Sequence, residues 1–244
     1  MKAYQRYFEQ VQSKLQTVFD QKEKIEIAAE WIADCLANEG FIYTSGTGHS
    51  HIFAEEIFYR AGGFARVVAI LDEALKLHID ASYSTEVERM EGYAAKLFEE
   101  FPISEKDIFI ISSNSGRNTV SIEMAMIAKE KGAKVIVITN LKHTQSITSR
   151  HPSGKKLFEI ADLFFDNNGE IGDASVSIQG LESKVGATST PTGAVILQSI
   201  MVQAAENLVQ KGIIPEIFSS SNSDEGEAHN EALIRKYKGK IKGL

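Results

Sequence analysis

Residues 107–132, DIFIISSNSGRNTVSIEMAMIAKEKG, join two kinds of hydrophobic pattern. The run DIFIIS is short and almost wholly apolar, which predicts a buried strand, whereas IEMAMIAKEK has apolar residues at helical spacing. Gly132 then stands where helices commonly end. Between the two patterns lies SNSGRNT, which is rich in hydroxyl and amide side chains and has no acidic residue. The stretch therefore predicts a buried strand that leads through a polar turn into a helix.

The same plan repeats on both sides of this stretch. Short apolar runs, each predicting a strand, are FIYT at 41–44, RVVAIL at 66–71, KVIVITN at 134–140 and ADLFFDN at 161–167. Helical patterns lie between and after them, at 51–61, at 85–100 and at 191–209, where Thr190 caps a helix that starts at Pro191. Because the strands do not alternate with polar residues, both of their faces are buried. We therefore expect an α/β fold, a three-layer sandwich with a mostly parallel, doubly wound central sheet.

The rest of the chain is divided as follows. Residues 1–40 have helical spacing throughout and predict an N-terminal helical extension packed on the main domain, which covers 41–212. Residues 213–244 predict a C-terminal loop and a short helix, with the polar segment SSSNSDEGEAHN at 219–230 in the loop.

Composition excludes several classes of function. The 244 residues are 43% hydrophobic with a net charge of −7, so the chain has no general attraction for nucleic acid. Its single cysteine, Cys35, allows no disulfide within the chain, which suits a reducing compartment. We find no secretory signal and no apolar run long enough to span a membrane. We therefore expect a cytoplasmic protein that binds neither membranes nor nucleic acid.

Three polar clusters precede helices, TSGTGHS at 44–50, SSNSGRNT at 112–119 and ATSTPTG at 187–193. Ligands of parallel sheets bind beyond the carboxyl ends of the strands, and helix N-termini there offer free amide donors. Hydroxyl groups without acids make a neutral cradle for a phosphate. The residues that we expect to bind a phosphosugar are Gly46, Gly48, Ser50, Ser113, Asn114, Ser115, Asn118, Thr119, Ser189 and Thr190.

A nucleotide cofactor is the competing interpretation of the first cluster. The segment GTGHSH begins like the dinucleotide fingerprint, and Asp72 follows the next strand, but His51 occupies the third glycine position. The phosphate loop that ends in GK[ST] is also absent. We therefore expect no cofactor. The spacing of His49 and His51 does not place both rings on one helix face, so we expect no metal.

These motifs, GTGHS after one strand and SNSGRNT after another, resemble those of the sugar isomerase (SIS) domain family. The resemblance covers about residues 35–210. It implies a phosphosugar-binding protein that forms a homodimer or homotetramer with sites near the subunit interfaces. Within the family, the pair Ser50–His51 and the segment FAEE at 53–56 are most similar to phosphoheptose isomerases, in which FAEE lies about one helical turn further on. Arg117 after SNSG resembles the SGRT of N-acetylmuramic acid 6-phosphate etherases.

Aldose–ketose isomerisation needs a general base over two adjacent carbons and a second group that moves hydroxyl protons. Glu56 is our first candidate for the base, and Glu88 and Glu91 are alternatives of the same chemical type. The remaining catalytic candidates are His51, His78 and His229, with His143 and His151 predicted to be loop residues and Lys184 a possible phosphate partner. The function predicted is thus a sugar-phosphate isomerase; a non-catalytic phosphosugar sensor and a phosphosugar lyase or etherase are the alternatives.

Overall fold

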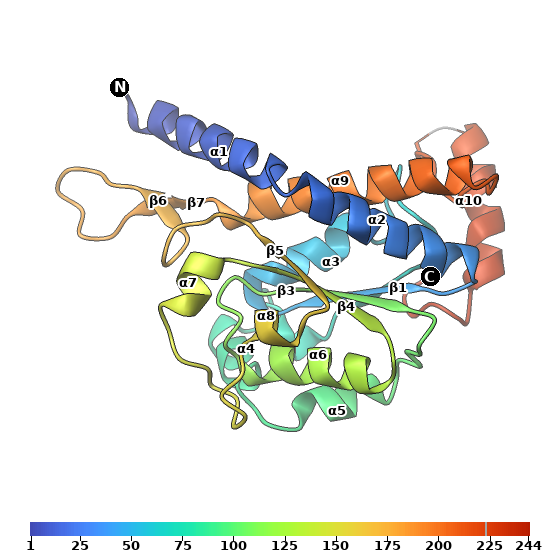
Figure 1. Cartoon of the computed structure of the whole chain (residues 1–244), viewed down its shortest axis with the longest axis horizontal. Helices are drawn as coiled ribbons and strands as arrows, with labels where there is room; N and C mark the ends of the chain where they lie inside the picture. The colour runs from blue at the N-terminus through green and yellow to red at the C-terminus, as the bar shows by residue number, and fades with distance from the viewer. Residues whose placement is uncertain (223) are drawn as a thin grey trace.

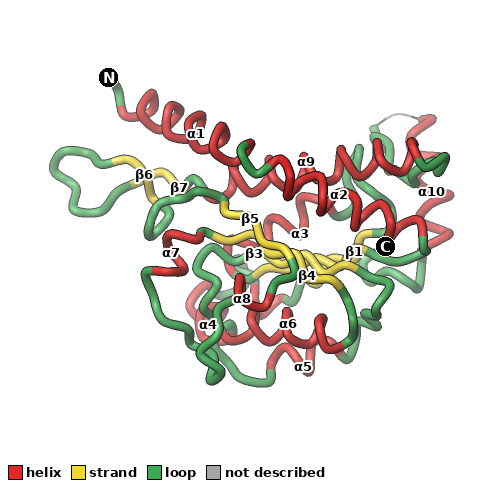
Figure 2. Tube along the Cα trace, viewed as in Figure 1, coloured by secondary structure: helices red, strands yellow, loops and turns green. Residues whose placement is uncertain are grey.

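The computed structural model describes residues 1–222 and 224–244. Its centre is a five-stranded sheet in the order β2-β1-β3-β4-β5, and every neighbouring pair in it is parallel (Figure 2). The strands are β1 (Ile42–Gly46), β2 (Val67–Ile70), β3 (Ile108–Ser112), β4 (Lys134–Thr139) and β5 (Leu163–Asp166). Because β1 lies between β2 and β3, the chain winds outward in both directions from the centre of the sheet.

Helices cover both faces of the sheet (Figure 1). One layer contains α1 (Ala3–Phe19), α2 (Lys22–Ala37), α3 (Ile52–Ile57) and α9 (Ser189–Gln210), and the other contains α4 (Ala81–Val87), α5 (Tyr93–Phe98), α6 (Thr119–Glu130) and α8 (Leu157–Ile160). The short helix α7 (Leu141–Gln145) follows β4, and α10 (Asp224–Tyr237) lies at one end of the molecule. The predicted three-layer α/β sandwich with a parallel sheet is confirmed.

Strand β3 shows why the sheet needs two helical layers. Ile108 and Ile110 pack in the apolar cluster with α2 and α9, whereas Phe109 and Ile111 pack in the cluster with α5 and α6. All four side chains are buried, and each contributes about 1.5–3 kcal/mol relative to an exposed position. The consecutive apolar residues of the sequence therefore fill two separate cores.

Two predicted boundaries are wrong. The single helix expected at 85–100 is two helices, α4 and α5, because Gly92 lies between them with a left-handed φ of 76°. The loop expected at 219–230 instead contains the start of α10. The acidic residues Asp224, Glu225 and Glu227 lie in its first turn, where they complement the positive end of a helix, and Leu233 and Tyr237 are buried further along.

A second, antiparallel sheet is absent from the sequence prediction. Its strands β6 (Ala174–Val176) and β7 (Val185–Ala187) form a hairpin that projects beside α1 (Figure 1). The hydroxyl of Tyr7 in α1 donates to the carbonyl of Ala187 at 2.7 Å, and Arg6 donates to the carbonyl of Ser177 at 2.9 Å. Gly186 has no side chain, and a Cβ there would lie 2.7 Å from the Tyr7 ring. Helix α1 thus holds the hairpin in place.

Candidate functional site

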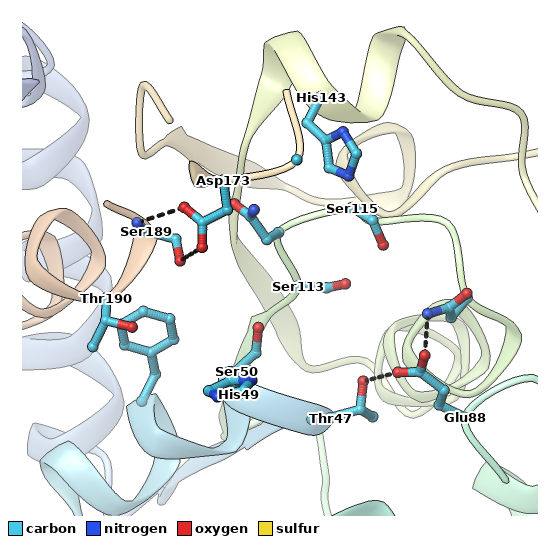
Figure 3. Close-up of a pocket in the computed structure, with 15 residues that line it drawn as sticks. Thr47, His49, Ser50, Glu88, Ser113, Ser115, His143, Asp173, Ser189 and Thr190 are labelled. Atoms are coloured by element: carbon cyan, nitrogen blue, oxygen red, sulfur yellow. Dashed lines mark hydrogen bonds between the residues drawn. The ribbon is translucent and has the colours of Figure 1, made fainter. Parts of the chain in front are cut away.

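A cavity of about 270 Å³ opens at the carboxyl ends of β1, β3 and β4, beside the start of α9 (Figure 3). Parallel sheets bind ligands at this edge. Most of the lining residues have polar side chains, and the residues are Thr47, Gly48, His49, Ser50, Phe53, Glu88, Ser113, Asn114, Ser115, Asn118, His143, Gly172, Asp173, Ser189 and Thr190.

The loop after β3 forms one wall of the cavity. Its backbone is fixed by the end of β4, since the Thr139 hydroxyl donates to the carbonyl of Ser113 at 2.7 Å. The backbone N–H of Gly116 donates to the Ser113 hydroxyl at 3.2 Å, and its left-handed φ of 57° turns the chain toward α6. The side chains of Ser113 and Ser115 lie at the cavity (Figure 3). The loop therefore presents hydroxyl and amide groups from a rigid backbone.

The turn after β1 forms the facing wall. A 3-10 helix, η1 (Gly48–His51), connects β1 to α3, and this tight turn brings the carbonyl oxygen of Ser50 against Gly46. A Cβ on Gly46 would lie only 2.3 Å from that oxygen. Gly46 thus shapes the turn without lining the cavity, while Gly48 and Ser50 do line it.

Glu88 is one of two carboxylates in the cavity wall. It immediately follows α4, and its two oxygens accept hydrogen bonds from the Thr47 hydroxyl, at 2.9 Å, and from the Asn118 amide, at 2.7 Å (Figure 3). Burial raises the pKa of Glu88 above the usual 4.5, against the opposing effects of the Thr47 hydrogen bond and of Arg89 and Arg150. A carboxyl with a raised pKa exchanges its proton closer to neutral pH.

The second carboxylate, Asp173, lies outside the three acid-free clusters and was not predicted to line the site. It accepts from the backbone N–H groups of Thr188 and Ser189, at 3.1 and 2.9 Å, and from the Ser189 hydroxyl at 2.6 Å (Figure 3). Helix α9 starts at Ser189, so the predicted cap at Thr190 is wrong. The first amides of α9 are therefore occupied by an acid from a distant loop.

His143 was predicted to be a loop residue, but it lies in α7 and lines the cavity. Its Nδ1 atom is buried and has no hydrogen-bond partner among the described residues. Burial lowers the pKa of His143, and the positive charge of Arg117 acts in the same direction, although Asp173 opposes both. The imidazole is therefore neutral at pH 7, when it can donate one hydrogen bond and accept another.

The structure brings together most of the predicted phosphosugar-binding residues. Eight of them line the cavity: Gly48, Ser50, Ser113, Asn114, Ser115, Asn118, Ser189 and Thr190. Thr119 does not, because its buried hydroxyl donates to the carbonyl of Arg150 at 3.4 Å. Gly46 acts on the turn behind the cavity, as described above.

None of the four predicted catalytic residues lines the cavity. Glu56 is held by an ion pair with Arg60 and by the Gln198 amide, 2.8 Å from its carboxylate. The His51 ring bonds to the carbonyl of Gly48 within its own turn. His78 lies in the segment before α4. His229 belongs to helix α10, and its Nε2 atom lies 2.8 Å from the carbonyl oxygen of Ile217, to which it hydrogen-bonds.

The prediction of Glu56 rested on the similarity of FAEE at 53–56 to phosphoheptose isomerases, in which this segment lies about one helical turn further on. In the structure α3 ends at Ile57, so Glu56 lies in the last turn of a short helix, where its carboxylate meets Arg60 and Gln198. Some polar residues that line the cavity were not predicted, although their positions in the sequence gave an indication. Thr47 and His49 belong to the first cluster, and His143 follows the carboxyl end of β4.

The alternative base Glu88 lies in the cavity wall, as described above, whereas the other candidates from the sequence lie elsewhere. Glu91 is exposed in the segment between α4 and α5, and Lys184 is exposed in the loop of the β6–β7 hairpin. No group of three or more His, Cys, Asp or Glu in residues 1–222 and 224–244 is placed to hold a metal ion. Within the same residues, every helix is too short or too polar to cross a membrane.

A family model described as SIS domain matches residues 6–140, which is more than half of the chain. The chain belongs to the SIS domain family. It also belongs to the UPF0309 proteins, since one from Halalkalibacterium halodurans is 42% identical over 234 residues, 96% of this chain and 96% of that protein. The predicted resemblance to the family is confirmed.

Solved structures show the same fold. A phosphoheptose isomerase from Francisella tularensis has a TM-score of 0.55 and 15% identity, over 84% of this chain and 100% of that one. The sugar isomerase domain of an RpiR transcription factor from Sphaerobacter thermophilus has a TM-score of 0.50 and 14% identity, over 98% and 99%. At such identities the likeness is one of fold, and the chemistry must be argued from the SIS domain's own cavity.

Proposed function

We propose that the cavity binds a phosphorylated sugar and that the protein interconverts aldose and ketose phosphates, with Glu88 as the general base. The observation that carries this proposal is the position of Glu88. A carboxylate of raised pKa lies in the cavity wall, and the loop of Ser113 and Ser115 lines the same cavity. Phosphate binding and proton transfer would then use separate groups.

The phosphate fits the loop after β3. Its hydroxyl and amide groups, from Ser113, Ser115 and Asn118, are neutral donors, so they hold a dianion without a fixed positive charge in the cavity. The loop also leads directly into α6, whose first turn contains no acid. A helix N-terminus without acids favours a negative ligand in front of it.

The proton chemistry fits Glu88 and His143. Glu88 takes the proton from C2 of the aldose, which gives an enediol, and returns a proton to C1 to form the ketose. His143, as a neutral imidazole, donates a proton to the carbonyl oxygen and accepts one from the neighbouring hydroxyl. Figure 3 shows these two side chains on different sides of the cavity, so a sugar between them would meet both.

Glu88 replaces Glu56 in this role because Glu56 is engaged by Arg60 and Gln198 outside the cavity lining. A non-catalytic sensor is the second candidate function. It is favoured by the two hydrogen bonds that the Glu88 carboxylate already accepts, from Thr47 and Asn118, since a carboxylate so held also suits recognition of a sugar hydroxyl.

The two functions are separated by exchange of the C2 proton. A thermal-shift screen of aldose and ketose phosphates identifies ligands, and NMR in D2O then follows loss of the C2 proton signal from each aldose, or of a C1 proton signal from each ketose. We expect exchange with wild type and a loss of about 10²–10⁴-fold in Glu88→Gln, with ligand binding retained. Glu56→Gln is the matched control. Binding without exchange in wild type supports the sensor, and exchange that persists in Glu88→Gln excludes Glu88 as the base.

We further propose that the chain forms a homodimer or homotetramer. Val195, Val202 and Val209 recur every seven residues on α9, and are 41%, 69% and 61% exposed. Phe8 and Phe19 on α1 are also exposed, at 67% and 63%. Such apolar rows on neighbouring helices are typical of surfaces that pack against another chain.

A further inference from the structure

Three arginines lie together beside the cavity but outside its lining. Arg89 follows α4, Arg117 belongs to the loop after β3, and Arg150 lies between α7 and α8. The backbone N–H of Arg150 donates to the carbonyl of Arg117 at 2.9 Å, so two of these segments are adjacent. Partial burial lowers the pKa of Arg150, and the positive charges of Arg117 and Arg89 add to that effect. The three guanidinium groups therefore share one region.

This region carries an excess of positive charge. Among the described residues, ion pairs of arginine are formed by Arg60, Arg66 and Arg235, and by none of these three. Glu88 is the carboxylate whose charge acts on Arg150, and its oxygens are engaged by Thr47 and Asn118. Arg150 is thus influenced by two other positive groups and one acid, in a chain whose net charge is −7.

The cluster is connected to the cavity through a single side chain. Arg150 Nη1 donates to the Asn118 amide oxygen at 2.7 Å, and the amide nitrogen of Asn118 donates to Glu88 at 2.7 Å. A guanidinium has five N–H donors, so Arg150 keeps several for another acceptor. Arg117 Nε is also buried without a partner in the described part of the chain. Arg150 therefore has unused donors one side chain away from the cavity, and Arg117 has an unused donor in the loop that lines it.

We propose that Arg89, Arg117 and Arg150 form a second anion site, which binds a negatively charged group at the other end of the same ligand. The substrate class is then a sugar phosphate with a second anionic group, either a carboxylate or another phosphate. This inference rests on the proposed function, because it places the first phosphate on the loop of Ser113 and Ser115. Arginine suits the role because its planar fork binds carboxylate and phosphate oxygens in pairs.

The test compares dissociation constants by titration calorimetry at constant ionic strength. The probes are glucose 6-phosphate, glucose 1,6-bisphosphate for a second phosphate, and 6-phosphogluconate for a carboxylate. We expect one or both of the doubly anionic probes to bind wild type at least about tenfold more tightly than glucose 6-phosphate, as charge-assisted hydrogen bonds allow. That preference should fall as salt is added, since exposed charges are screened.

The preference is the dissociation constant of glucose 6-phosphate divided by that of the tighter-binding doubly anionic probe. Arg89→Gln and Arg150→Gln should each reduce this ratio at least about fivefold. Lys155→Gln removes an equal charge at an exposed position in the loop of Arg150 and should leave the ratio as in wild type. Melting curves check that each variant folds. Equal binding of all three probes by wild type would overturn the second site while leaving the proposed function intact. A uniform loss for every probe would assign the arginines to the first phosphate. If no probe and no other sugar phosphate binds, the proposed function itself fails.

Discussion

The carboxylate of Asp173 accepts the backbone N–H of Ser189 at 2.9 Å and its hydroxyl at 2.6 Å, which closes the base of the β6–β7 hairpin. Both residues line the cavity, so the hairpin starts and ends in its wall (Figure 3). The same contact supplies a cap for α9, whose own preceding residue, Thr188, makes no side-chain cap. Cavity, hairpin and helix therefore meet in one interaction.

Asp173→Ala should lower the free energy of unfolding by about 1 kcal/mol, as loss of a helix N-cap usually does. The amides of Thr188 and Ser189 would lose their acceptor in this variant. Urea denaturation measures the change, and Glu182→Ala, at an exposed position in the hairpin loop, is the comparison. Equal stability of the two variants would mean that the cap contributes nothing.

Glu88→Gln should change how stability depends on pH. Since burial raises the pKa of Glu88 in the folded chain above 4.5, the folded state holds this proton more tightly than the unfolded state does. The contribution of Glu88 to stability is thus complete below pH 4.5 and is lost as pH rises through the folded pKa. Glutamine resembles the neutral form, so the variant should gain stability relative to wild type as the pH rises from 4.5 through the folded pKa of Glu88.

Urea unfolding at several pH values measures that difference. Glu91→Gln removes an equal charge at an exposed position and should show no comparable gain across the interval. If the free energies of unfolding of wild type and Glu88→Gln changed in parallel with pH, the Glu88 carboxyl would have the same proton affinity in the folded and unfolded states.

Gly116→Ala should destabilise the protein more than Gly62→Ala. Both glycines have a left-handed φ, of 57° and 82°, so both substitutions bear the cost of about 1 kcal/mol for that conformation. Only at Gly116 would the new Cβ crowd its neighbours, at 3.1 Å from the Thr144 hydroxyl and 3.2 Å from the Thr139 hydroxyl. Thermal melting gives the ranking, and a matching loss of sugar-phosphate affinity at Gly116 alone would tie the loop to the ligand.

Val202→Asp should dissociate the proposed oligomer, because it places a charge in the middle of the exposed valine row on α9. Light scattering at micromolar concentration should show a mass well above 26.9 kDa for wild type and a mass near that value for the variant. Leu181→Asp, on the hairpin loop, should behave as wild type. A wild-type protein that already scatters as a monomer would contradict the proposal.

The sheet was predictable because the residues of each strand alone indicate that both of its faces are buried. Consecutive apolar residues such as Ile108 and Phe109 must be covered on both sides, whatever the rest of the chain does. The strand-to-helix turns follow from the same logic, since parallel strands end at one edge. The Ser113 and Ser115 loop could therefore be identified as a candidate site from a single segment.

The acidic part of the site could not be placed in this way, although Glu88 was named as an alternative base. Glu88 follows a helix rather than a strand, and Asp173 lies seven residues beyond the end of β5. The Thr47 hydroxyl that holds Glu88 is 41 residues away in the sequence. The spacing of apolar residues in the sequence does not indicate that an acid at either position lies in the cavity. Glu56 was chosen instead because the FAEE segment at 53–56 resembles phosphoheptose isomerases, although the position of that segment along the helix differs by about one turn.

Helix α2 near the start of the chain packs beside α9 near its end, and together they cover one face of the sheet (Figure 1). During synthesis, the strands of the sheet leave the ribosome well before α9 does. Until α9 has been synthesised, Ile110 and Ile136 on that face lack one of the helices that cover them in the folded protein. The growing chain therefore exposes aggregation-prone apolar surface, and completion of α9, rather than of the sheet, ends that exposure.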